Sequence, residues 1–234
     1  MSASGSPRTT VPVPPTVTAL YAVMTPEPLE RSDHLPLPHG ALLRSRGSSE
    51  AGLARLAGRP HQLVLRRVGP TREAARLLHD ARVEALELAA RHDGVVIDLL
   101  VPRLVEHDAA TTSVAHTALW VTIDFTRHAE GVLSTAGLRV FGLPELSVAS
   151  DAPPAMLSAV MTGVAHRIVA QWPSQDPVGP EVVTLRDIAY GLGDPQASIT
   201  SVDRRLAVVV DFDPATGTLP LALVDDPATT LFQP

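Results

Sequence analysis

The chain has 234 residues, enough for one large domain or two small ones, and a formal net charge of −6. This acidic balance argues against general nucleic-acid binding, which needs a concentrated basic surface to displace counterions. The chain contains no cysteine, so disulfides, thiolate nucleophiles and cysteine metal sites are all excluded. It also contains no lysine, a bias that we assign to a bacterium with a GC-rich genome.

The N-terminal residues are rich in Ser, Thr and Pro, which predicts a disordered or tethered arm over residues 1–15. They carry no apolar run of the kind found in signal peptides, and no segment approaches the ~20 apolar residues that span a bilayer. We therefore expect a cytoplasmic protein without membrane contact. Residues 16–234 are expected to form a single α+β domain, which includes a long connector at residues 26–50 that is rich in Pro, Gly and Ser.

The first half of the chain shows the clearest secondary-structure patterns. Runs of apolar and β-branched residues predict strands at residues 17–24 and 61–68. Apolar residues recur on one face and charged residues on the other from 72 to 92, which predicts a long amphipathic helix. An Asp-Gly pair ends this helix, and the apolar run that follows predicts a buried strand at residues 95–101.

Two hairpins are predicted in the second half. The first joins strands at residues 117–127 and 131–140 across a short turn, and the second joins strands at 206–212 and 221–225. Pro220 stands at the head of the last strand and cannot donate a ladder hydrogen bond, which predicts an edge position for that strand.

A second long helix is predicted at residues 155–172. Its faces carry almost no charge, so this helix is expected to be covered on two sides or to face a partner. The order of strands and helices predicts a two-layer α+β sandwich: a mostly antiparallel sheet with both long helices on one face, ferredoxin-like or related.

Catalytic and metal-binding motifs are absent from the sequence. Its nine histidines fall in no tight ligand pattern, the chain has no Gly-x-Ser-x-Gly turn, and its glycines form no phosphate loop. We predict no metal site, no cofactor and no catalytic residue. Carboxylates in or near strand ends are places where general acids and bases often stand, although such residues also commonly cap turns; they are Asp93, Asp98, Asp124, Asp211 and Asp213.

Residues 135–146 form the densest unusual segment. Glycine and proline within a strand pattern indicate a bulge or an edge. The candidate binding residues are Arg139, Phe141, Gly142, Pro144 and Glu145. The same residues have a structural interpretation, which we favour: Phe141 anchors the core, the glycine and proline make a bend, and Glu145 or Arg139 satisfies the backbone or forms an ion pair.

The run of residues 137–146, Gly-Leu-x-x-Phe-Gly-x-Pro-Glu-Leu, resembles the signature of a poorly characterised bacterial family of unknown function, and the similarity extends over residues 131–172. The resemblance implies an α+β fold and no known activity.

The leading interpretation is a non-enzymatic protein-interaction module, namely an accessory, immunity-type or assembly protein. Its partner is expected to be another protein or further copies of the chain, bound through the N-terminal arm and the helix at 155–172. One alternative is a small hydrolase or ligand-binding enzyme with a site near residues 137–146, where Arg139 and Glu145 would stand at the rim of a pocket. A structural subunit of a larger assembly is the other alternative.

Overall fold

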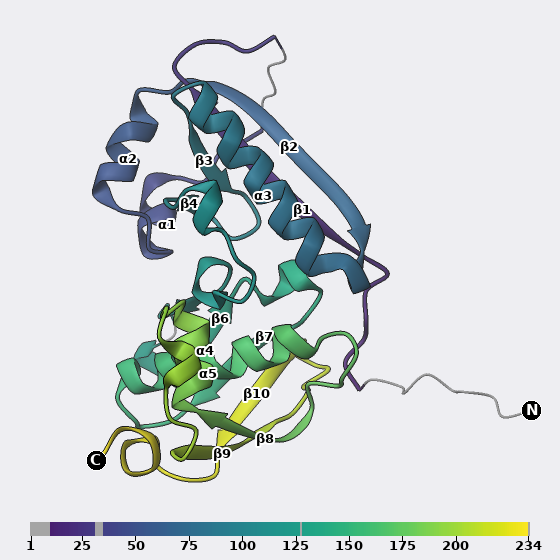
Figure 1. The fold of residues 1–234 in the computed structure, drawn as a ribbon, viewed down its shortest axis with the longest axis vertical. Coiled ribbons are helices and arrows are strands. Elements are labelled where there is room, and N and C mark those ends of the chain that lie inside the picture. Colours follow the sequence, from purple (N-terminus) through teal and green to yellow (C-terminus); the bar gives the residue numbers. More distant parts are fainter. Residues whose placement is uncertain (1–9, 31–34, 127, 234) are drawn as a thin grey trace, which may run out of the picture.

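The computed structural model describes residues 10–30, 35–126 and 128–233, which form two β-sheets, each with its own helices (Figure 1). The first sheet, sheet A, has four strands in the order β2-β1-β3-β4, and every neighbouring pair is antiparallel. Its strands are β1 (Thr16–Thr25), β2 (His61–Pro70), β3 (Val95–Asp98) and β4 (Arg103–Val105).

Helices cover both faces of sheet A. The amphipathic helix α3 (Ala74–Arg91) packs its apolar stripe on one face. The short helices α1 (Gly40–Ser45) and α2 (Glu50–Ala57) lie on the opposite face, over a small cluster that includes Met24 and Ile97. Strand β3 is therefore buried on both sides, which agrees with its continuous apolar run.

The second sheet, sheet B, has six strands in the order β5-β6-β7-β10-β9-β8. Only the β7 and β10 pair is parallel. The strands are β5 (Thr122–Asp124), β6 (Val132–Ala136), β7 (Glu145–Ala149), β8 (Gly179–Thr184), β9 (Arg205–Val210) and β10 (Thr218–Leu223). Helix α4 (Pro154–Gln171) packs on one face of sheet B, and α5 (Leu185–Leu192) packs against α4.

One hydrophobic cluster runs from sheet A into sheet B, and it includes Val11 as well as the apolar stripes of α3 and α4. Val11 is fully buried, and the carbonyls of Pro14 and Pro15 accept hydrogen bonds from Thr71. Residues 10–15 of the expected arm are thus packed against the domain. The remainder of that arm lies outside the described residues.

The α+β class is confirmed, but the predicted arrangement, with both long helices on one face of one sheet, needs correction. Residues 106–121 turn through short 3₁₀ helices instead of extending along β4, so β5 begins a second sheet. Because each sheet has its own apolar face, each long helix packs on a different sheet. This change places residues 106–121 at the junction between the sheets.

Both predicted hairpins form, as β5 with β6 and β9 with β10. The edge position expected from Pro220 is wrong, because β10 lies between β7 and β9. The Asp211 N–H donates to the Pro220 carbonyl at 2.9 Å, but the proline has no N–H to return the bond, and the regular ladder to β9 covers residues 221–223 only. Helix α4 is covered along most of its length, so coverage on two sides is the alternative that the structure shows for the segment 155–172.

Candidate functional site

The predicted site segment around Glu145 holds a tight turn. The Glu145 carboxylate accepts hydrogen bonds from Thr135 Oγ1 at 2.7 Å and from the backbone N–H groups of Gly137, Leu138 and Arg139 at 2.9, 3.2 and 3.2 Å. These donors tie the start of the short 3₁₀ helix Leu138–Phe141 to β6 and β7. A carboxylate with four donors has a structural task, so Glu145 is poorly placed to act as an acid or base.

The neighbouring predicted residues also anchor the fold. Phe141 is buried and meets Trp120 edge to face, with ring centroids 6.0 Å apart. Gly142 adopts the left-handed conformation with φ of 80°, and Pro144 is half-buried in the bend. Arg139 is exposed and lines a pocket of about 450 Å³ together with Glu145. The structure thus brings Arg139 and Glu145 to one pocket. Of the two, Glu145 is engaged by the turn, and Arg139 is the one whose charge is available to the pocket.

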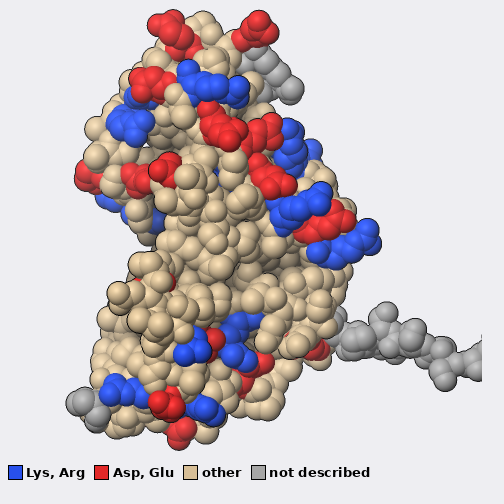
Figure 2. Space-filling view, viewed as in Figure 1, with Lys and Arg blue, Asp and Glu red and all other residues tan. Residues whose placement is uncertain are grey.

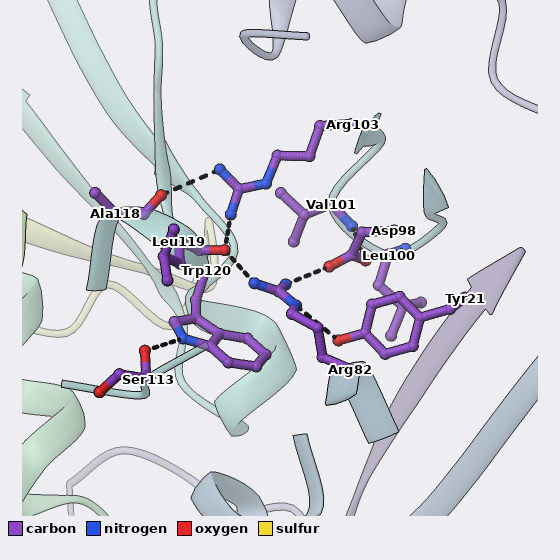
Figure 3. A network of polar contacts seen from close by, with 10 residues as sticks. All are labelled: Tyr21, Arg82, Asp98, Leu100, Val101, Arg103, Ser113, Ala118, Leu119 and Trp120. Carbon is purple, nitrogen blue, oxygen red and sulfur yellow. Dashed lines mark hydrogen bonds and ion pairs between the residues drawn. The ribbon is translucent and has the colours of Figure 1, made fainter. Parts of the chain in front are cut away.

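A buried arginine network joins sheet A to residues 106–121, which lie at the junction between the sheets and which we call the junction segment (Figure 3). Arg82 of α3 is 1% exposed and donates from Nη2 to Asp98 Oδ2 at 2.9 Å and from Nε to the Tyr21 hydroxyl at 3.3 Å. Its Nη1 donates to the carbonyl of Leu119. This ion pair is enclosed by protein, so its geometry is fixed by several bonds at once.

The same network holds the segment before β5. The Arg82 guanidinium carbon stands 3.5 Å from the Trp120 ring centroid, a cation–π contact, and the Trp120 indole donates to Ser113 O at 2.8 Å. Arg103 of β4 donates to the carbonyls of Ala118 at 3.2 Å and Leu119. Burial first and then Arg82 lower the pKa of Arg103 to about 10, so this guanidinium stays charged at neutral pH.

A pocket of about 300 Å³ opens beside this network, and it is the candidate site. Its polar lining includes Arg46, which follows α1, as well as Arg103 and His107 on β4 and just after it, and Thr122 at the start of β5. Arg46 also lines the pocket of Arg139, so the two cavities share one wall. We call the smaller cavity the junction pocket.

Three buried polar atoms in the described residues have no hydrogen-bond partner, and all belong to residues that line the junction pocket. They are Arg46 Nη1, His107 Nε2 and Thr122 Oγ1. Roughly nine in ten buried polar groups in folded proteins have a partner. Three unpartnered atoms on residues that line one cavity single out this region as the candidate site.

Carboxylates close to the pocket are already engaged. Asp98 pairs with Arg82 and also accepts the N–H groups of residues 100 and 101. Asp124 binds Arg46 Nη2 at 2.9 Å, and Glu106 accepts hydrogen bonds from Ser49. Burial acts to raise the pKa of Asp124, but hydrogen bonds from Thr126 and the charge of Arg46 outweigh it and lower that pKa.

The positive charge of the pocket is enclosed. On the face shown in Figure 2, charged side chains gather over α2 and α3 and at the lower end, while the band between the sheets is largely uncharged. Arg82 and Arg46 each have a carboxylate partner, whereas the hydrogen bonds of Arg103 go to carbonyl oxygens. The site therefore presents several hydrogen-bond donors and one guanidinium without a carboxylate partner among the described residues, Arg103, while the exposed carboxylate of Glu106 lines the same pocket.

His107 makes the stability of the protein depend on pH. Burial first, and then the charges of Arg82 and Arg103 and the neighbouring His116, lower the pKa of His107 from 6.5 to about 4, while Asp108 opposes the shift. Because the unfolded chain takes up this proton more readily, stability is complete above pH 6.5 and falls as pH drops from 6.5 to about 4. With His107 half-exposed, we expect a loss of about 1–2 kcal/mol over this window.

Urea unfolding of the full chain at a series of pH values measures this dependence. His116 and His166 also have lowered pKa values, mainly through burial, and add to the loss in the same direction. The His107→Gln variant removes the proton site and should flatten part of the curve. An unchanged pH slope in that variant would contradict the assignment.

Sequence reasoning missed the junction pocket. Its polar residues come from separate segments of the chain, and only Asp98 and Asp124, which hold Arg82 and Arg46, stood among the candidate aspartates. His107 is one of the nine histidines that fall in no tight ligand pattern. The one available signal was the length of the 26–50 connector, since long loops often carry function, and Arg46 lies in it.

No family model matches the chain, and no curated protein or solved structure matches it either. The resemblance of residues 137–146 to a bacterial family stays a prediction. Within residues 10–30, 35–126 and 128–233, no three His, Asp or Glu side chains gather closely enough to hold a metal ion. No helix in that same part of the chain has the length and apolar character needed to cross a bilayer.

Proposed function

We propose that this chain is a non-enzymatic binding protein and that the junction pocket receives an acidic group, carboxylate or phosphate, of its ligand. The observation that carries the proposal is the set of unpartnered polar atoms on Arg46, His107 and Thr122 around one cavity. An arginine N–H, a hydroxyl and an imidazole N–H can all donate to an oxyanion, so one kind of acceptor suits the three groups.

Charge supports an acid as the entering group. The guanidinium of Arg103 faces carbonyl oxygens, and the nearby ion pairs of Arg82 and Arg46 are balanced by Asp98 and Asp124. An incoming anion gains from the charge of Arg103 in a setting partly shielded from water, where electrostatic attraction is stronger than at an open surface. Glu106 also lines the pocket and opposes an anion, but it is exposed, so water and salt screen its charge.

Binding fits this chemistry better than catalysis does. A general base works best with a pKa near the operating pH, and the pKa of His107 at about 4 makes it a weak one. Glu106 and Asp124 already accept hydrogen bonds from their neighbours. The available groups are donors, so the pocket is equipped to hold an anion.

An NMR titration of the labelled full chain with inorganic phosphate, and separately with acetate, tests the proposal. We expect the resonances of the Arg46 side chain and the His107 imidazole to move with either or both probes. The Thr122→Val and Arg46→Gln variants should each bind about tenfold more weakly or worse, because each loses a hydrogen bond to a charged group. Far-UV circular dichroism checks that both variants fold.

Arg139→Gln is the matched control, because Arg139 lines the adjoining pocket and is exposed. It should leave the affinity of the junction pocket within about twofold of the parent. If neither anion moves the Arg46 and His107 resonances, the proposal is wrong. If Thr122→Val and Arg46→Gln both bind as tightly as the parent protein, the anion lies elsewhere and the proposal is overturned as well.

We propose as a second candidate the accessory, immunity-type or assembly role expected from the sequence. The observation that favours it is a largely apolar face of strands β8, β9 and β10 that no helix or strand in the described part of the chain covers. Such a face is typical of a surface that contacts another protein chain, whether a different protein or a second copy of the same chain. The same observation favours the role of a structural subunit.

A further inference from the structure

The outer face of strands β8, β9 and β10 carries an exposed apolar patch. Helices α4 and α5 lie on the other face of sheet B, where alternate residues such as Leu206 and Val208 are buried (Figure 1). Two side chains from each strand or its end form the patch, which we call the open face: Pro180, Val182, Ala207, Val209, Ala222 and Val224. The valines are 42%, 40% and 59% exposed in that order.

Strand register makes the open face continuous. Pro180 and Val182 stand opposite Val209 and Ala207, and Val209 stands opposite Ala222 on the next strand. The N–H of Val224 donates to the Ala207 carbonyl, which extends the patch by one more position. Neighbouring side chains across a sheet lie about 5 Å apart, so these six form one continuous surface.

Opposite charges mark the two ends of β9 on this same face. Arg205 and Asp211 are both exposed and both lie in the alternation of Ala207 and Val209. The midpoint between them is Val208, whose side chain points to the buried side. Consider a two-fold axis that lies in the plane of the face, runs across the strands and passes over Val208. This axis places Arg205 of each molecule over Asp211 of the other, so two such pairs form.

We propose that the open face docks a second copy of this chain, sheet against sheet, with β9 antiparallel to its own counterpart. In this arrangement Val209 packs on Ala207 of the second copy, Pro180 on Val182, and Ala222 on Val224. Each apolar position meets an apolar position, and the contact is the same seen from either molecule, as an isologous interface requires. The proposal concerns a surface apart from the junction pocket and is independent of ligand binding.

Charge complementarity is what selects a second copy as the occupant. An uncharged centre flanked by one arginine and one aspartate matches its own two-fold image with both ends paired. Asp226 also lies near the Arg205 end. The Oδ1 atoms of Asp226 and Asp211 each accept a local backbone N–H, at 2.9 and 2.7 Å, and Asp211 is the carboxylate that the two-fold arrangement places over Arg205. A membrane surface fits less well, because anionic lipids favour patches rimmed by several basic residues.

Sedimentation velocity of the full chain over a wide concentration range tests the proposal. We expect a monomer–dimer equilibrium in the parent protein. Val209→Glu places a carboxylate at the centre of the apolar patch and should raise the dimer dissociation constant about 100-fold or more. Val68→Glu is the matched control, since Val68 is 50% exposed on a strand of sheet A, and it should leave dimerisation unchanged.

Charge exchange tests the orientation. Arg205→Asp should weaken the dimer about tenfold, because it sets two carboxylates face to face, and adding Asp211→Arg in the same chain should restore it. A parent protein that stays monomeric at all concentrations overturns the proposal, and capture of a different protein by this face does the same. A dimer that resists Val209→Glu also overturns it, because that dimer forms through another surface.

Discussion

Replacing Asp98 by Asn should lower the free energy of unfolding by about 3–5 kcal/mol, the largest loss that we expect from a change without altered shape. Asp98 and Arg82 are 4% and 1% exposed, so the substitution leaves a guanidinium without its counter-charge away from water. The carboxylate also accepts backbone N–H groups of residues 100 and 101, which an amide oxygen can satisfy only in part. Urea denaturation followed by circular dichroism measures the loss.

The ion pair of Arg67 and Glu84 is the control for this prediction. Its side chains are 51% and 47% exposed, so Glu84→Gln should change stability by no more than about 1 kcal/mol. A loss below that limit for Asp98→Asn would show that water reaches the Arg82 pair. The network would then not be the rigid wall of the junction pocket.

Local structure was largely predictable from the sequence, because it depends on neighbouring residues. The period of apolar residues at 72–92 predicts a helix that the structure forms as Ala74–Arg91, and the helix expected at 155–172 forms as Pro154–Gln171. The division of the strands into two sheets depends instead on whether β5 pairs with β4 or begins a separate sheet. That choice lies in the non-periodic residues 106–121, whose contacts are long-range.

The residues of the candidate site were also predictable only where a local pattern marks them. Glu145 and Phe141 stood out because glycine, proline and an aromatic residue close together suggest a turn, and the structure gives them the structural task that the sequence favoured. Arg46, His107 and Thr122 are unremarkable in their own segments. Their meeting follows from the approach of α1 to β4 and β5, and no local pattern encodes that approach.

Replacing Gly137 by Ala should destabilise the protein by about 3 kcal/mol or more, through backbone strain and a clash together. Gly137 has φ of 128°, and a Cβ atom there would lie 2.2 Å from the Trp120 carbonyl oxygen. Backbone cannot yield as a flexible side chain can, and Trp120 is itself fixed by Arg82 and Phe141. Thermal and urea unfolding of the variant measure the effect.

Gly131→Ala separates strain from the clash. Gly131 also has a positive φ, 75°, but no atom lies within 4 Å of the position of its Cβ, so only conformational strain of about 1 kcal/mol is expected. The difference between the two variants then reports the steric part at Gly137. Equal losses would mean that the strand end moves away from Trp120 at little cost, and that the glycine of the 137–146 signature serves flexibility instead of close packing against the junction segment.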